Sequence, residues 1–151
     1  MAQQPRGATV RFFTPLLDKR WLAKGDGPMG AYTCERRFER VLEGKYVRMA
    51  VLWRFDDKTY EEIAMFGRDP AEKRLTFWSF TSDGKNSRGV NVDADDIPDG
   101  AVAFEAQMPA GLARMILWTS ERRSRLHVTV ESASKKGWNS LLEQRHTIAD
   151  E

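Results

Sequence analysis

The sequence predicts an all-β fold: an antiparallel, closed or nearly closed β-barrel of about ten strands with a short N-terminal helix. Apolar and polar residues alternate with a period of two through most of residues 33–148, which indicates strands with one buried face. Polar, turn-forming segments separate these strands at residues 56–58, 67–70, 82–85, 98–100 and 136–137. Open sheet edges promote aggregation, so a meander of hairpins with little helix either closes on itself or stacks two sheets.

The chain divides into a polar, loose tail over residues 1–10 and a single barrel domain over residues 11–151. Thr14 followed by Pro15 is typical of a helix start, so one or two helical turns over residues 15–19 are predicted to plug one end of the barrel. Strands are predicted at residues 21–23, 31–42, 46–55, 60–66, 75–81, 88–92, 102–107, 115–119, 126–131 and 138–148. The last segment also fits a helix, but the preceding Gly137 and the meander pattern favour a strand.

Composition narrows the classes of partner. A length of 151 residues suits one domain with a real core, and the net charge of +2 from 24 basic and 22 acidic residues demands no polyanionic partner. The single cysteine, Cys34, excludes an intramolecular disulfide, and with only two histidines a structural zinc site is not expected. No signal peptide or membrane-spanning run is recognised, which predicts a cytoplasmic protein. We expect neither a nucleic-acid nor a membrane partner, and a homodimer is compatible with the sequence.

Four segments, taken in order, resemble a known group of proteins. An apolar turn leads into Trp21 and a glycine-rich loop (LLDKRW and GDG within residues 16–27), followed by ERRFERVLEGKYV at 35–47, FGRDP at 66–70 and LTFWSFTSDG at 75–84. This order resembles uncharacterised bacterial families of the calycin superfamily, which are related to nitrobindin and to the lipocalin and fatty-acid-binding barrels. The resemblance spans residues 16–147 and implies an antiparallel barrel of eight to ten strands around an internal cavity.

The same resemblance raises the question of haem. Nitrobindin-like members hold haem through a histidine on a late strand, and His146 is the position here that this would make a metal ligand. The residues around Trp21 depart from the haem-binding pattern, and the neighbours of His146 are polar. We therefore predict no tight haem binding and no cofactor. The opposite case rests on strand alternation, which could turn Leu142, Gln144 and His146 inward together.

Large apolar residues in the middle of three predicted strands are candidates for the wall of a cavity. In residues 46–55 the odd-numbered positions are the more apolar set and are predicted to point inward. Trp78 and Trp118 have apolar neighbours at two-residue spacing in their own strands. The predicted ligand-binding wall consists of Met49, Val51, Trp53, Trp78, Phe80, Ile116 and Trp118. The alternative is a barrel interior completely filled by these side chains.

One strand carries many charges. In residues 31–42 the set that contains Cys34, Arg36 and Phe38 is slightly more apolar than the set that contains Glu35 and Glu39. If the first set points inward, a buried Arg36 needs a carboxylate or a ligand as its partner, so Arg36 is a candidate ligand-binding residue. The alternative is a solvated strand face with cross-strand ion pairs. His127, between Leu126 and Val128, is predicted to face the other way from both, toward solvent.

No catalytic constellation stands out, so enzymatic activity is left uncertain. Ser79, Ser82 and Ser87 lack the glycine-flanked turn of hydrolase nucleophiles, and the adjacent Glu61 and Glu62 face opposite sides of a strand. The first hypothesis is therefore the binding or carriage of a small hydrophobic molecule in the barrel cavity. Its alternatives are a haem protein of nitrobindin type and an interaction module whose barrel is filled by side chains.

Overall fold

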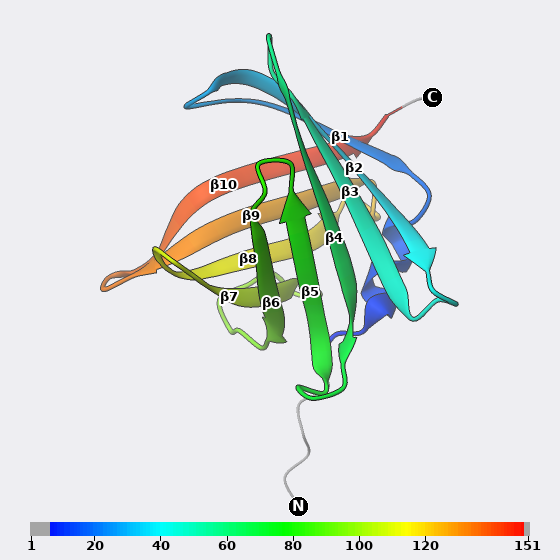
Figure 1. Cartoon of the computed structure of the whole chain (residues 1–151). Helices are drawn as coiled ribbons and strands as arrows, with labels where there is room; N and C mark the ends of the chain where they lie inside the picture. The colour runs from blue at the N-terminus through cyan, green and yellow to red at the C-terminus, as the bar shows by residue number, and fades with distance from the viewer. Residues whose placement is uncertain (1–6, 150–151) are drawn as a thin grey trace, which may run out of the picture.

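The ten strands follow one another around a closed antiparallel barrel, as the computed structural model of the chain shows for residues 7–149 (Figure 1). Each strand pairs with the next in sequence, and β1 closes the barrel against β10 through Trp21 opposite Ile148 and Leu22 opposite Thr147. The strands are β1 (Arg20–Gly27), β2 (Gly30–Val41), β3 (Tyr46–Arg54), β4 (Thr59–Asp69), β5 (Arg74–Thr81), β6 (Asn86–Val92), β7 (Val102–Met108), β8 (Gly111–Ser120), β9 (Arg125–Ser134) and β10 (Gly137–Ile148).

This architecture confirms the predicted fold class, an antiparallel ten-stranded barrel with one short helix. The last segment is a strand, as the meander pattern favoured, and it pairs with β9 along most of its length. Several strands are longer than predicted: β1 continues to Gly27, β8 begins at Gly111 and β9 continues to Ser134. No helix in residues 7–149 has the length and apolar character needed to cross a membrane.

The helix begins earlier than predicted. A 3₁₀-helix, η1 (Val10–Leu16), is capped by Thr9, whose hydroxyl accepts the Arg11 N–H at 3.3 Å, and Pro15 lies near its end. The predicted start at Thr14 and Pro15 was wrong because Thr9 supplies the cap instead, and the backbone is already extended at Leu17. The part of the expected tail at residues 1–6 lies outside the described residues, whereas the Ala8 N–H donates to Asn91 Oδ1 at 3.0 Å.

Helix η1 contacts β2, β3 and β4 and fills one end of the barrel (Figure 1). Its buried Phe13 packs between Phe38 and Phe66, with ring centroids 5.7 and 4.5 Å away, and Phe66 in turn contacts Phe104 at 5.4 Å. The indole N–H of Trp21 donates to the Leu16 carbonyl at 3.0 Å and ties the helix to β1. The expected plug is therefore present, and the turns that join β1 to β2 and β3 to β4 lie at the opposite end of the barrel.

On the outer surface, a buried arginine holds the loop between β6 and β7. Arg114 donates two hydrogen bonds to the Asp96 carboxylate, at 2.8 and 2.9 Å, and one to Glu131 at 2.9 Å. Its guanidinium also lies 4.3 Å from the ring centroid of Trp138. The positive charge of the buried Arg114 is compensated, because the carboxylates of Asp96 and Glu131 both bond to its guanidinium.

Candidate functional site

A cavity of about 200 Å³ occupies the half of the barrel that η1 does not fill. Side chains from most of the strands surround it, and the apolar ones dominate. The apolar wall consists of Trp53, Phe77, Phe104, Ala106, Met108, Ala113, Met115, Val130 and Leu142. The polar residues Arg36, Glu62, Ser79 and Ser87 line it as well, and so does Arg114, whose guanidinium is held by Asp96 and Glu131. An apolar pocket with a few convergent polar groups is the usual form of a small-molecule site.

Arg36 is the buried cation of this half of the barrel, with 3% of its surface exposed. Its Nε–H donates to His146 Nε2 at 3.3 Å, one Nη2 hydrogen to Gln144 Oε1 at 3.1 Å and one Nη1 hydrogen to Met49 Sδ at 3.4 Å. All three acceptors are uncharged. The Gln144 amide continues the network to the Tyr32 hydroxyl at 3.4 Å, at the rim of the open end. These contacts fix the guanidinium at the boundary between the core and the cavity.

His146 lies inside the barrel with none of its surface exposed. Since Arg36 donates to Nε2, the ring proton is assigned to Nδ1, which donates to the Leu126 carbonyl at 3.3 Å. Burial, and then the positive charge of Arg36, lower the pKa of His146 to about 3. His146 is therefore neutral at physiological pH, and both of its ring nitrogens are engaged within the protein.

Two acidic groups lie close to Arg36. Burial raises the pKa of the Glu62 carboxyl, and the charge of Arg36 opposes that shift as the second cause. Burial also raises the pKa of the fully buried Cys34 thiol, so this thiol stays protonated and inert. Within residues 7–149, Arg36 forms no ion pair with a carboxylate, Glu62 included.

A pair of hydroxyls lines the cavity on the side of β5 and β6. The Ser79 and Ser87 oxygens are 2.7 Å apart in opposed positions of the two strands. Two residue pairs further along, Gly89 lies beneath the Phe77 ring, where an added Cβ would come within 2.1 Å of a ring carbon. The absence of a side chain at Gly89 thus lets the Phe77 ring lie against the strand and leaves the cavity open.

The predicted ligand wall is only partly on the inside. Trp53 and Arg36 line the cavity, while Met49 and Val51 are buried in the interior core beside it. Of the two orientations left open for residues 31–42, the structure has Cys34, Arg36 and Phe38 inside the barrel, because all three side chains are buried.

The predicted inward orientation of Trp78 and Phe80 was wrong. Phe77 and Ser79 are the inward residues of β5, so Trp78 and Phe80 lie on the outer face, and Phe80 is 57% exposed. The register explains this, since Phe66 and Ala64 of β4, both buried, stand opposite Phe77 and Ser79.

The same correction applies to Ile116 and Trp118. Met115 and Leu117 are the inward residues of β8, which places Ile116 and Trp118 outside the barrel. Trp118 stacks on His127 with ring centroids 4.8 Å apart, and the predicted outward orientation of His127 is confirmed.

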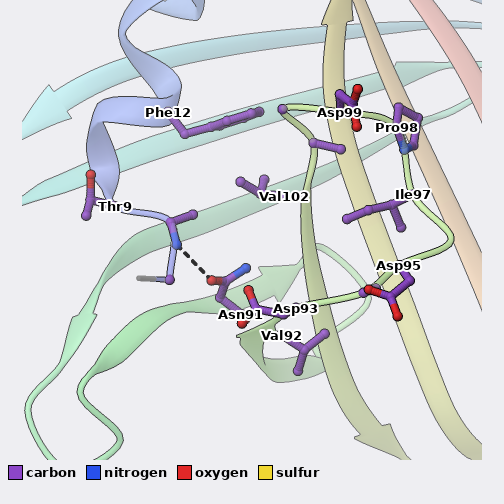
Figure 2. Close-up of a pocket in the computed structure, with 15 residues that line it drawn as sticks. Thr9, Phe12, Asn91, Val92, Asp93, Asp95, Ile97, Pro98, Asp99 and Val102 are labelled. Atoms are coloured by element: carbon purple, nitrogen blue, oxygen red, sulfur yellow. Dashed lines mark hydrogen bonds between the residues drawn. The ribbon is translucent and has the colours of Figure 1, made fainter. Parts of the chain in front are cut away.

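A larger pocket, of about 710 Å³, lies on the outer surface between the start of η1 and the loop that joins β6 to β7 (Figure 2). Figure 2 shows Phe12 and Val102 on one side of it and Asp93, Asp95 and Asp99 along the loop. It has no basic side chain in its lining, and no group of three or more His, Cys, Asp or Glu residues within residues 7–149 could hold a metal. The interior cavity has an apolar wall and a buried arginine instead. It is therefore the better candidate for a small-molecule site, although its volume is smaller.

No protein-family model matches this chain, and no curated protein matches it in sequence. The ten-stranded barrel does not by itself identify a calycin relationship, so that resemblance stays a prediction.

Sequence reasoning missed Glu62, Ser79 and Ser87 at the cavity. It also did not identify Gln144 and His146 as partners of Arg36, or Tyr32 as the next group in that network. The signal for Glu62 was available, because it stands directly opposite Val51, which was predicted to point inward. For residues 142–146, the alternative that turned Leu142, Gln144 and His146 inward together is what the structure shows, and a bulge between Ser140 and Leu142 precedes this segment. That bulge puts Trp138 on the outer face and Leu142 in the cavity, although both positions are even-numbered.

Proposed function

We propose that this protein binds a small, largely apolar molecule in the open half of the barrel. The observation that carries the proposal is the cavity itself, since it persists in an interior whose other half is filled by aromatic side chains. An engineered protein cavity of about 150 Å³ accepts benzene. A volume of about 200 Å³ therefore suits a single ring with a few substituent atoms.

The wall supports the same size and chemistry. Trp53 and Phe104 give flat apolar surfaces, and Ala106 opposite Ala113 leaves the space between β7 and β8 free of large side chains. Tyr32, Trp53 and Phe55 form an aromatic rim at the open end, with ring centroids 5.0 to 6.5 Å apart. A ligand could enter past this rim without opening the barrel wall.

The test is a titration of benzyl alcohol, a neutral single-ring probe, followed by calorimetry and by tryptophan fluorescence. Ala106→Leu puts three extra carbon atoms into the cavity, and we expect it to weaken binding at least tenfold. Ala50→Leu makes the same change on the outer face of β3 and should leave binding unchanged. Equal binding by both variants, or no binding by the unmodified protein, would contradict the proposal.

Haem binding is the alternative that the position of His146 favours, because this side chain is buried inside the barrel. As placed, the residues do not fit haem: His146 is absent from the cavity wall, and its Nε2 accepts a hydrogen bond from Arg36. We therefore propose no haem-dependent step. A sharp, shifted Soret band on adding haemin that is lost in His146→Ala would reverse this choice.

An interaction module is the remaining alternative, favoured by the exposed Ile63 and Phe80, which stand opposite each other on the outer face of β4 and β5. If Ala106→Leu leaves benzyl alcohol binding unchanged and Phe80→Ser abolishes it, the interaction module is favoured over the cavity. A cytoplasmic location is proposed from the sequence alone.

A further inference from the structure

The Arg36 guanidinium has hydrogen-bonding capacity that the protein does not use. A guanidinium carries five N–H donors, and three of them are engaged, with His146, Gln144 and Met49. The Cys34 sulfur also interacts with this guanidinium, so at least one Nη hydrogen remains without a partner, and the Arg36 side chain lines the cavity. A hydrogen bond from a guanidinium to a carboxylate is stronger than one between neutral groups.

The charge of Arg36 is also uncompensated at close range. Its three acceptors are neutral, and burying a cation without a hydrogen-bonded anion is unfavourable. Arg114, the other buried arginine of the described chain, shows the contrast, because two carboxylates contact it directly. Among the described residues, Arg36 has no carboxylate in hydrogen-bonding contact, because the Glu62 carboxyl lines the same cavity and acts on it only through its charge.

We propose that the ligand carries a carboxylate, and that this group binds in the cavity between the Arg36 guanidinium and the Glu62 carboxyl. This inference rests on the proposed function and names the chemical class of its ligand. The carboxylate accepts a hydrogen bond from the Arg36 guanidinium, and the ring of the ligand extends along the apolar wall toward Ala106 and Met115. Glu62 donates a hydrogen bond to the same carboxylate when it is protonated.

Glu62 makes binding depend on pH. The ionisable group that acts on it is Arg36 on β2, while the flanking Val51 on β3 and Thr81 on β5 carry no charge. His146, beyond Arg36, is neutral. An ionised Glu62 repels a second carboxylate beside Arg36, and a protonated Glu62 does not. Carboxylate binding therefore takes up a proton, and the affinity decreases as the pH rises through the range in which Glu62 ionises.

The first experiment compares benzoate with benzamide, which has the same shape and no charge, by calorimetry on the unmodified protein between pH 5 and 8. We expect benzoate to bind at least tenfold more tightly than benzamide at pH 5, and this preference to shrink toward pH 8. If benzamide binds as well as benzoate at pH 5, the inference is overturned while the proposed function stands. If neither these probes nor benzyl alcohol binds, both fail.

Neighbouring residues of opposite orientation provide matched controls. Arg36→Gln should remove the preference for benzoate and keep benzamide binding, whereas Arg37→Gln, on the outer face of the same strand, should change neither. Glu62→Gln should keep benzoate binding and abolish its pH dependence, whereas Glu61→Gln should keep both. A pH dependence that survives Glu62→Gln, or a benzoate preference that survives Arg36→Gln, would overturn the inference. So would an equal loss of benzoate binding in Arg36→Gln and Arg37→Gln, or an equal loss of its pH dependence in Glu62→Gln and Glu61→Gln.

Discussion

The two halves of the barrel interior are built by the same strands but differ in what fills them. Toward η1, the side chains of Phe13, Phe38, Phe66 and Phe104 contact one another, with buried Leu16 and Trp21 around them. Toward the open end, the same strands place Arg36 on β2 and Glu62 on β4 beside a cavity. On β2, Phe38 lies in the filled core, and Arg36, two residues away on the same face, lines the cavity.

This difference shows how a barrel can separate stability from binding. Aromatic packing around η1 closes one end and buries the apolar surface that stabilises the fold. The other half then tolerates a buried arginine, a neutral histidine and empty space, which would each weaken a core. Truncating side chains in the two halves should therefore have unequal effects on stability.

The largest expected effect is the loss of an aromatic ring from the filled half. Phe66→Ala removes a fully buried ring in contact with Phe13, Phe77 and Phe104, and should lower the free energy of unfolding by about 3–5 kcal/mol. Trp53→Ala, at the cavity wall, should cost less than Phe66→Ala, because the space beside it is already open. Urea denaturation of both variants makes the comparison, and a larger loss for Trp53→Ala would refute it.

Acid should act on the interior of the barrel through His146, which is hydrogen-bonded to Arg36. Its folded-state pKa of about 3 lies below the ordinary value of 6.5, so the unfolded chain binds more protons between these pH values. Stability should therefore fall as the pH decreases from about 6.5 to about 3, by on the order of 1 kcal/mol per pH unit from this group. His146→Gln should flatten the pH dependence of unfolding relative to His127→Gln. Identical profiles for the two variants would contradict the assignment.

A smaller effect is expected where the plug is attached. Trp21→Phe keeps an aromatic ring in the core but removes the N–H that donates to the Leu16 carbonyl, leaving that carbonyl buried without this donor. We expect a loss of about 1–3 kcal/mol in the free energy of unfolding, with benzyl alcohol binding unchanged. Thermal unfolding and the same titration measure both quantities. A loss of binding without a loss of stability would show that the two halves are not separate.

The smallest effect belongs to the outer face. Phe80→Ser replaces a side chain that is 57% exposed and points away from the cavity. The free energy of unfolding should change by less than about 0.5 kcal/mol, and ligand affinity should not change. Chemical denaturation and calorimetry test this, and a tenfold loss of affinity would place Phe80 at the binding site after all.

The fold was predictable because turns and alternation are local features, whereas the wall of the cavity depends on pairing between strands. In LTFWSFT both faces of the strand are apolar enough to be buried, and only the pairing of Phe66 with Phe77 decides that Trp78 points outward. In β8, Met115 and Ile116 are both apolar, so the sequence does not decide which of them points inward. Ile116 lies on the outer face and is nevertheless buried. The bulge before Leu142 breaks the alternation in β10, and nothing in the local sequence announces it.

The central claim is that a small molecule binds in the open half and leaves the filled half unchanged. The five tryptophan indole N–H signals report on it directly in a nitrogen–proton correlation spectrum during titration with benzyl alcohol. Trp53 lines the cavity, Trp21 is bonded to Leu16 in the filled half, and Trp78 and Trp118 lie on the outer face. We predict that the Trp53 signal shifts with saturation while those of Trp21, Trp78 and Trp118 stay in place. A shift of Trp78 or Trp118 with Trp53 unmoved would contradict the account.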